Sequence, residues 1–509
     1  PIVVKSYTKI HELFMHPMKK WLTLAIVSSA LFLIVVDMTV LYTALPALTR
    51  DLQATSSQKL WIINVYALVV SGLLPGLGTL GDRLSHKPVF LAGLAVFGIA
   101  SLCAAFSPAA EWLIFARVLL AIGAALMMPA TLSIIRLTFT DNRERSFAIG
   151  VWAAIASGGA AFGPVLGGFL MEHYWWGSVF LINVPIVLLT LVLATVILPK
   201  RAGNRDKPWD LKGSLQIMMG LLGGVYAIKE LGKSQPSYAL AAASFAVGAF
   251  FMLKFVRRQK RQARPLIDFA LFRELPFSSA VAAAMVASAA LIGMELALSQ
   301  HMQLVRELSP LEAGLLLLPL PLASVFAGPL TGFMLPRADK AKVLWGSLLL
   351  SGIGMASYLV LHDAAVSAQV ASLVILGLGL GAVMTAASSA VMLNVAPQQA
   401  GMAASIEEVS YELGAVIGVT VLGTIMSAVY SATLVIPESA GLLPNAHDTL
   451  DAALLAAEQL PAELGLQVSE LARSAFDKAF IVVLATASTI LLVAAATIRH
   501  LHLRARRAA

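Results

Sequence analysis

Long runs of apolar residues, separated by short polar segments, make up most of this chain. About 20 apolar residues of α-helix, each rising about 1.5 Å, cross the hydrocarbon core of a bilayer. Fourteen runs are long enough to do so, at residues 21–45, 60–80, 88–106, 111–136, 147–171, 178–198, 211–231, 237–256, 276–300, 311–335, 342–362, 367–393, 403–430 and 476–499. The pattern therefore predicts an all-α membrane protein with 14 transmembrane helices.

The composition excludes a soluble protein. Of 509 residues, 59% are hydrophobic and 13% are charged, whereas soluble domains carry about 25% charged residues. The single cysteine, Cys103, excludes an intrachain disulfide and a cysteine metal cluster. The chain has no phosphate-binding loop, nucleophile elbow or metal-ligand cluster, so we expect neither an enzyme nor a cofactor.

The basic residues predict the orientation in the membrane. An even number of spans puts both ends of the chain on one side. If that side is cytoplasmic, it receives most of the 36 Lys and Arg residues, as the positive-inside rule requires. The net charge of +8 therefore reflects membrane orientation rather than nucleic-acid binding. The longest outer segment, 431–475, is acidic, and its LDAALLAAEQL stretch has the spacing of a short helix or hairpin.

A carboxylate interrupts the first apolar run. Asp37 lies in the stretch LFLIVVDMTVLYTALP, which Pro46 is expected to end. An acid at this depth costs about 2.5–3.5 kcal/mol on insertion scales, and it usually faces a cavity where it handles protons or cations. The run therefore indicates a transporter.

Four glutamates lie in later runs. Glu295 falls in 276–300, and Glu407, Glu408 and Glu412 fall in 403–430. Helical spacing puts Glu407 on one face with small residues, and Glu408 and Glu412 on another. We expect Glu407 to bind a cation, with Glu412 as the second choice. Glu295 is either a binding acid or a strut between helices, and Glu408 is either a binding acid or an interfacial residue.

Other residues could complete a cation site. Arg117, inside the 111–136 run, cannot lose its proton and needs a partner. It either ties its helix to polar backbone nearby or tunes a proton-carrying carboxylate. Aromatic rings attract cations by about 0.5–2 kcal/mol, although the same rings also serve helix packing. The candidates are Tyr42, Trp61, Tyr66, Trp152, Phe180 and Tyr411.

Four local motifs point to one family. Residues 78–87 read GTLGDRLSHK, with Gly78, Asp82, Arg83 and Lys87 as the motif positions. Residues 159–168 read GAAFGPVLGG, with Gly159, Gly163, Pro164, Gly167 and Gly168. Residues 37–46 read DMTVLYTALP, and residues 176–185 read WGSVFLINVP. Together they resemble signatures of the major facilitator superfamily and of its fourteen-helix branch of drug:proton antiporters.

This resemblance implies a domain plan. A cytoplasmic segment at 1–20 precedes a six-helix half at 21–198, and a 199–265 linker with two additional transmembrane helices leads to a second six-helix half at 266–500, followed by a basic tail at 501–509. In this family the 78–87 motif gates the cytoplasmic face. The 159–168 motif packs helices closely and implies export.

The resemblance also implies a function. It predicts a monomeric pump, multi-pass in the bacterial inner membrane, that exchanges lipophilic mono- and dicationic biocides and dyes for protons. Methyl viologen, quaternary ammonium compounds, ethidium and bisbiguanides are such substrates, and a carboxylate in the 403–430 run would contribute to dication recognition. The alternative is an exporter of a different amphipathic antibiotic, peptide or lipid-linked solute, because the same scaffold hosts these.

Overall fold

The computed structural model describes residues 2–54, 56–199, 203, 209–231, 237–262, 265–393, 395, 400–437, 446–447 and 449–508. Helices account for almost all of this part of the chain, and it contains no β-strand. Fourteen helical segments in it are long and apolar enough to cross a membrane. The predicted all-α membrane fold with 14 transmembrane helices is therefore confirmed.

The helices are numbered in the order in which they follow one another along the chain. They are α1 (Ile2–Asp51), α2 (Ser56–Leu84), α3 (His86–Ala105), α4 (Ala110–Thr138), α5 (Asn142–His173), α6 (Ser178–Leu181), α7 (Asn183–Ile197), α8 (Leu211–Leu231), α9 (Tyr238–Arg261), η1 (Phe269–Arg273), α10 (Leu275–Gln300), η2 (His301–Val305), α11 (Pro310–Leu317), α12 (Pro319–Met334), α13 (Lys340–Leu361), α14 (Val366–Leu393), α15 (Ala400–Thr433), α16 (Leu450–Ala457) and α17 (Ala462–Ala508). The short helices α6 and α11 open the spans that α7 and α12 complete.

The first helix passes the position at which we expected it to end. α1 continues through residue 46 to Asp51, so the prediction that Pro46 halts it is wrong. A proline removes one backbone donor, but neighbouring helices and side chains replace the lost hydrogen bond in a membrane bundle. The same tolerance applies to Pro75, Pro129 and Pro164, which lie inside α2, α4 and α5.

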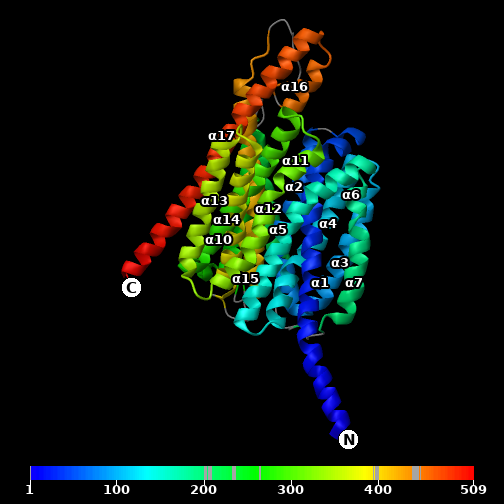
Figure 1. Cartoon of the computed structure of the whole chain (residues 1–509), viewed down its shortest axis with the longest axis vertical. Coiled ribbons are helices and arrows are strands. Elements are labelled where there is room, and N and C mark those ends of the chain that lie inside the picture. Colours follow the sequence, from blue (N-terminus) through cyan, green and yellow to red (C-terminus); the bar gives the residue numbers. More distant parts are fainter. Residues whose placement is uncertain are drawn as a thin grey trace.

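The acidic outer segment is largely helical. α16 covers most of the LDAALLAAEQL stretch, and α17 already begins at Ala462, inside the 431–475 range. Residues 438–445 and 448 lie outside the described part of the chain. Figure 1 shows α16 and the start of α17 projecting beyond the bundle, at the end opposite to the N-terminus.

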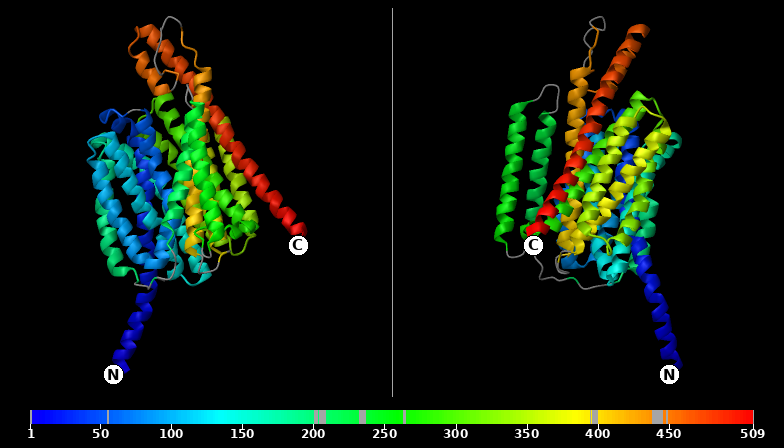
Figure 2. Two further views of the ribbon diagram at one scale, coloured as in Figure 1. Left: turned by 180° about the vertical axis from the view of Figure 1, so that it is seen from behind. Right: turned by 60° about the vertical axis from the view of Figure 1, so that its left-hand side comes forward.

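Two hydrophobic cores organise the bundle. One joins α1 to α7 around residues such as Phe97 and Leu113, and the other joins α10 to α17 around residues such as Leu348 and Phe480. Helices α8 and α9 stand beside the rest of the bundle (Figure 2). There α8 packs closely on α2, since a Cβ added to Gly76 would lie 3.1 Å from the Cβ of Ser214.

The two six-helix bundles touch along two seams. In one seam α2 runs beside α15, where a Cβ added to Gly78 would lie 3.4 Å from the Cβ of Ser405. In the other, α5 runs beside α11 and α12, where a Cβ added to Gly150 would lie 3.3 Å from the Cα of Pro329. Small residues at such seams let helix backbones approach closely.

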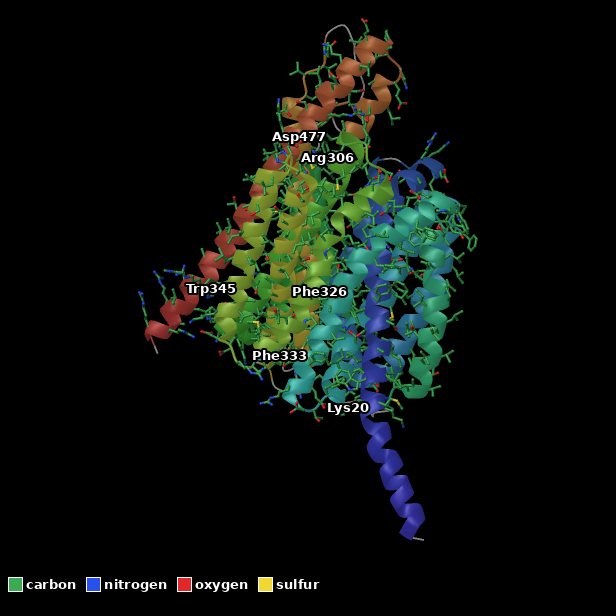
Figure 3. The ribbon with its side chains drawn as sticks, in the orientation of Figure 1. Lys20, Arg306, Phe326, Phe333, Trp345 and Asp477 are labelled. Atoms are coloured by element: carbon green, nitrogen blue, oxygen red, sulfur yellow. The ribbon has the colours of Figure 1, made fainter. Side chains whose placement is uncertain are left out.

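Charged contacts gather at the two ends of the bundle. Figure 3 shows Arg306 and Asp477 near the α16 hairpin and Lys20 at the opposite end. Asp477 Oδ1 lies 2.8 Å from His301 Nε2, and Lys20 Nζ donates to Glu144 Oε2 at 3.1 Å. This distribution suits a bundle whose middle lies in hydrocarbon.

A polar cluster closes the base of the α8–α9 hairpin. Asp210 Oδ1 accepts hydrogen bonds from Gly213 N (3.0 Å) and Arg258 Nη2 (2.8 Å), and its Oδ2 accepts from Arg258 Nε (3.1 Å), Gln259 Nε2 (3.2 Å) and Gln262 Nε2 (3.1 Å). Burial opposes the charged form, but these donors, Arg258 first, hold the pKa of Asp210 below its usual value. A carboxyl whose pKa falls on folding stabilises the fold above its unfolded pKa, and that contribution is lost as the pH falls through the folded pKa.

We expect Asp210→Asn to lower the thermal unfolding temperature at pH 7, since lost hydrogen bonds to a charged group cost about 1–3 kcal/mol. The difference in unfolding temperature between the variant and the wild type should narrow as the pH falls below about 4, because the wild-type carboxyl then takes up a proton. Unfolding of the purified protein in detergent across this pH range measures both effects. Asp363→Asn is the control, since the side chain of Asp363 is 75% exposed. If the difference in unfolding temperature between Asp210→Asn and the wild type stays constant with pH, the charge of Asp210 does not have this role.

Candidate functional site

A buried ion pair lies inside the first bundle. Asp37 of α1 and Arg117 of α4 are joined by a hydrogen bond from Arg117 Nη1 to Asp37 Oδ2 at 2.7 Å, and their side chains are 0% and 2% exposed. Asn183, the first residue of α7, donates through Nδ2 to Asp37 Oδ1 at 2.9 Å. Both carboxylate oxygens therefore have a donor, which is what a charge needs at this depth.

Arg117 also holds α2. Its Nε donates to the carbonyl oxygen of Ile62 at 3.3 Å, and its guanidinium lies 4.4 Å from the centre of the Tyr66 ring. Arg117 thus contacts polar backbone and a carboxylate at once, which are the two kinds of partner that the sequence left open for it. Neither Asp37 nor Arg117 lines the two cavities described below.

Two members of this network were not among the predicted site residues. Asn183 bonds Asp37 and also donates to Ser101 Oγ of α3 at 3.3 Å. The signal for Asn183 was present, since it is an amide inside the 176–185 motif and an apolar run. Ser101 had no such signal, because a serine in a membrane helix usually bonds its own backbone.

The carboxylates of the second bundle lie in a different environment. Glu407, Glu408 and Glu412 of α15 are 1%, 3% and 5% exposed. Ser388 donates to Glu407 Oε1, whereas Glu407 Oε2, Glu408 Oε1 and Glu412 Oε2 have no hydrogen-bond partner among the described residues. An ionised carboxylate without a counter-charge is costly in this environment, so a proton or a cation must neutralise each of them.

A cavity of about 630 Å³, measured with its open mouth, lies between the two bundles. Tyr42 and Thr39 line it from α1, Pro164 from α5, and Glu295 and Ser299 from α10. The charges of Glu295 and of Glu412 both reach Tyr42. The structure therefore brings acids of the second bundle to a tyrosine of the first, at the boundary where a substrate would lie.

The six predicted aromatic residues divide into two groups. Tyr42 lines the cavity, Tyr66 covers Arg117, and the hydroxyl of Tyr411 donates to the carbonyl oxygen of Met384 at 3.4 Å. The other three, which like Tyr66 and Tyr411 do not line the cavity, are packed within or between helices: Trp61 where α2 meets α8 and α15, Trp152 with its Nε1 donating to Thr131 Oγ1 at 3.2 Å, and Phe180 in the first core. For this second group the structure favours the packing role.

The 78–87 motif serves two different contacts. Gly78 gives α2 its close approach to α15. Lys87 Nζ donates to the carbonyl oxygens of Thr195 (2.8 Å) and Leu198 (2.6 Å), so it caps the C-terminus of α7 inside the first bundle. Arg83 is half-buried, and the side chain of Asp82 lies outside the described residues.

The 159–168 motif packs α5 against two helices. A Cβ added to Gly159 would lie 3.2 Å from Val35 Cβ, one added to Gly163 would lie 2.8 Å from Thr39 Cβ, and one added to Gly167 would lie 3.0 Å from Thr43 Cβ, all on α1. On its other side, a Cβ added to Gly168 would lie 3.0 Å from the Cα of Leu311, and one added to Gly314 would lie 3.3 Å from Pro164 Cβ. The motif thus sets the distance between α1 and α11, both of which border the cavity.

Comparisons with known proteins agree with this architecture. The sequence model of the Major Facilitator Superfamily matches residues 27–419. The chain is 39% identical over 482 residues to the methyl viologen resistance protein SmvA of Salmonella typhimurium, covering 94% of this chain and 97% of that protein. It is also 39% identical over 487 residues to the multidrug efflux pump LfrA of Mycolicibacterium smegmatis, covering 95% and 96%. The family resemblance inferred from the motifs is confirmed.

A solved structure supports the fold alone. The human organic anion transporter MFSD10 (TETRAN) superposes with a TM-score of 0.59 at 13% sequence identity, covering 93% of this chain and 99% of that one. At this identity the likeness carries the helix arrangement and not the transported compound.

We expect the Asp37–Arg117 pair to respond asymmetrically to neutralisation. Arg117→Gln leaves Asp37, which can take up a proton, whereas Asp37→Asn leaves a guanidinium that cannot lose one. Asp37→Asn should therefore destabilise the protein more, by about 3–5 kcal/mol for an uncompensated buried charge, and the double variant should cost less than the sum. Thermal unfolding in detergent at pH 7 measures this, and additive losses would contradict the pairing.

We expect Gly163→Leu to lower the thermal unfolding temperature by several degrees, because its side chain would collide with Thr39 and separate α5 from α1. The matched control is Gly346→Leu in α13, since a Cβ added to Gly346 meets nothing within 4 Å. Both variants are compared as purified proteins in the same detergent. Equal unfolding temperatures would rule out close packing as the role of this glycine.

Proposed function

We propose that this chain, which belongs to the Major Facilitator Superfamily, exports lipophilic mono- and dicationic drugs in exchange for protons. The similar proteins SmvA and LfrA are a methyl viologen resistance protein and a multidrug efflux pump. The observation that carries the proposal is the set of buried carboxylates with unpaired oxygens on α15, together with Glu295 in the lining of the cavity between the bundles. A cation-exchanging pump requires groups that are neutralised by a proton in one step and by the substrate in another.

The two acidic clusters would have different roles. Asp37 is already neutralised by Arg117 and held by Asn183, so we assign to it a proton-coupling role that involves loosening this pair. Glu407, Glu412 and Glu295 have no such fixed partner among the described residues and would bind the cation, with Glu408 as a further proton site. Tyr42 lines the same cavity and would face the cation with its ring.

Charge arithmetic favours more than one titrating acid. Export of a dication for one entering proton moves net positive charge outward, against a membrane potential that costs about 2.3 kcal/mol per charge per 100 mV. Two protons make the cycle electroneutral, and two protons need two carboxylates. The structure offers one in each bundle, Asp37 and Glu407, so that each exchange step would involve both halves.

The setting of the pump follows from the same features. We propose that it lies in the bacterial inner membrane as a monomer, surrounded by lipid, with both termini in the cytoplasm. The two seams, α2 with α15 and α5 with α11 and α12, would open alternately at the two faces. Glycines of the 78–87 and 159–168 motifs keep these seams close enough to seal. An exporter of another amphipathic antibiotic, peptide or lipid-linked solute is the alternative, and it would not need the α15 carboxylates.

Proteoliposomes with an imposed pH gradient test the function. Wild-type protein should export ethidium and methyl viologen, and each added cation should move protons the opposite way. We expect Glu407→Gln to reduce methyl viologen export at least tenfold and ethidium export much less, since a +2 substrate needs the second carboxylate. Glu463→Gln is the control, because Glu463 is an exposed acid at the start of α17. Equal losses for both cations would exclude Glu407 as the dication partner, and no proton-linked export by the wild type would exclude the function itself.

A further inference from the structure

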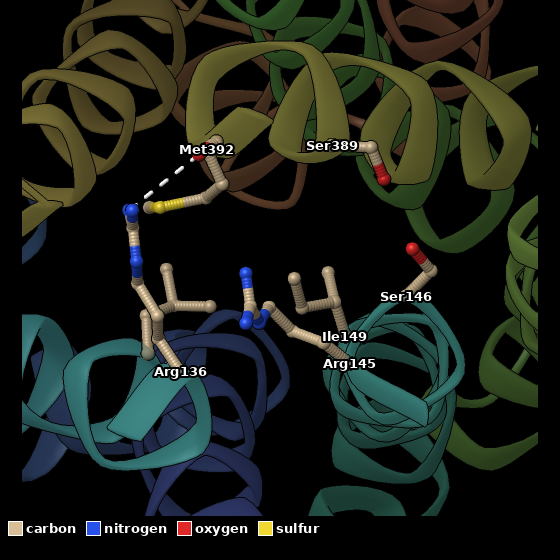
Figure 4. Close-up of a pocket in the computed structure, with 7 residues that line it drawn as sticks. Arg136, Arg145, Ser146, Ile149, Ser389 and Met392 are labelled. Carbon is tan, nitrogen blue, oxygen red and sulfur yellow. Dashed lines mark hydrogen bonds between the residues drawn. The ribbon is translucent and has the colours of Figure 1, made fainter. Parts of the chain in front are cut away.

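A second cavity lies at the end of the bundle opposite to the α16 hairpin, where α4, α5 and α14 meet (Figure 4). Its polar lining consists of Arg136 from α4, Arg145 and Ser146 from α5, and Ser389 from α14. Among the residues that the structure describes, no carboxylate lines it. The cavity therefore joins the first bundle to the second through cationic and hydroxyl groups, in a protein whose main cavity is lined by an acid.

The two guanidinium groups are only partly satisfied. Arg145 donates through Nε to the carbonyl oxygen of Phe139 and through Nη2 to that of Thr140, both at 2.9 Å. Arg136 donates through Nη1 to the carbonyl oxygen of Met392 at a long 3.5 Å. Neither Arg145 Nη1 nor Arg136 Nη2 has a partner in the part of the chain that the structure describes. Donors thus remain for a group inside the cavity.

Among the described residues, the nearby acids offset these charges only in part, through the charge of Asp141 acting on Arg145. Asp141 accepts hydrogen bonds from Arg143 N and Glu144 N and caps α5, and Glu144 pairs with Lys20. The charge of Arg145 acts on Arg136. Two like charges that share one cavity repel each other unless an anion lies between them.

A buried hydroxyl in the lining also indicates that an acceptor binds in this cavity. Ser389 is 3% exposed, and its Oγ has no hydrogen-bond partner among the described residues. Figure 4 shows this oxygen directed toward Ser146 across the cavity. Leaving a buried hydroxyl unsatisfied is unfavourable, so its partner is expected to be a group that enters the cavity. An acceptor placed between Ser389 and Arg145 would satisfy both groups.

We propose that this cavity binds a small, weakly hydrated anion of the chloride type. The rest of the lining is apolar, from Leu132, Ile149 and Met392. An apolar wall makes it costly to dehydrate a phosphate, which keeps its water strongly, and less costly to dehydrate a halide. Two arginines and a hydroxyl are enough donors for a monatomic anion.

The anion would act as a bridge between the two halves. Arg136 and Arg145 belong to the first bundle and Ser389 to the second, so the site is complete only while α4 and α5 lie against α14. A ligand that binds one conformation shifts the population toward it. Chloride therefore favours the conformation in which this end of the protein is closed, and opening at this end releases it.

Thermal unfolding of the full-length protein tests the site without any transported substrate. Sodium gluconate is replaced stepwise by sodium chloride or bromide at constant ionic strength. We expect a saturable rise in unfolding temperature for both halides, a half-saturating chloride concentration at least fivefold higher in Ser389→Ala, and no saturable rise in Arg136→Gln.

Two matched variants serve as controls. Ser133→Ala removes a hydroxyl on α4 that is also buried and without a partner among the described residues but does not line the cavity. Arg143→Gln removes an exposed arginine close to Arg145 in the sequence. Both should keep the wild-type chloride dependence. The proposal is overturned if wild-type protein shows no saturable halide effect, if phosphate replaces chloride as the stabilising ion, or if Ser389→Ala behaves like Ser133→Ala. If Arg136→Gln does not fold, the comparison of the two serine variants decides.

Discussion

The cost of placing a charge in hydrocarbon determines how this molecule is arranged. In the first bundle this cost is offset by neighbouring side chains, because Asp37 accepts hydrogen bonds from Arg117 and Asn183. That pair ties α1 to α4 and α7, and Arg117 extends the tie to α2 through the carbonyl of Ile62. The core of the first bundle closes around one fixed electrostatic contact, so a change in that contact moves several helices together.

The buried carboxylates of the second bundle have no such ion pair among the described residues. Glu407, Glu408 and Glu412 follow one another along α15, and each keeps an oxygen without a partner among the described residues. The two halves therefore differ in how their buried acids are neutralised. A fixed ion pair lies in one half, and in the proposed function the carboxylates of the other half would exchange a proton for a cation. Glycines on α5 let this helix lie close to α1 and to α11, because they place no side chain of their own at these contacts.

Charge is also distributed along the axis of the bundle. Acids lie at Glu295, in the cavity between the halves, and along α15, whereas Arg136 and Arg145 lie where α4 and α14 end and α5 begins. The arginine cavity and the acidic cavity both join the two halves, and both depend on how those halves are placed. An anion at one end and a cation in the middle would therefore act on the same conformational equilibrium.

The sequence by itself determined the 14 spans, the buried acids and the family, because hydrophobicity over about 20 residues and short motifs are local properties. It also singled out Asp37, Arg117 and the α15 glutamates, because an ionisable group stands out in an apolar run. Pairing could not be read in this way: Asp37 meets Arg117 80 positions later and Asn183 146 positions later, a proximity that only helix packing creates.

Tertiary structure likewise decided which aromatic residues reach the cavity, that Lys87 caps α7, and that α1 continues past Pro46. Each of these outcomes depends on the neighbours that a residue acquires across helices. The local pattern fixes only which face of its own helix a residue lies on.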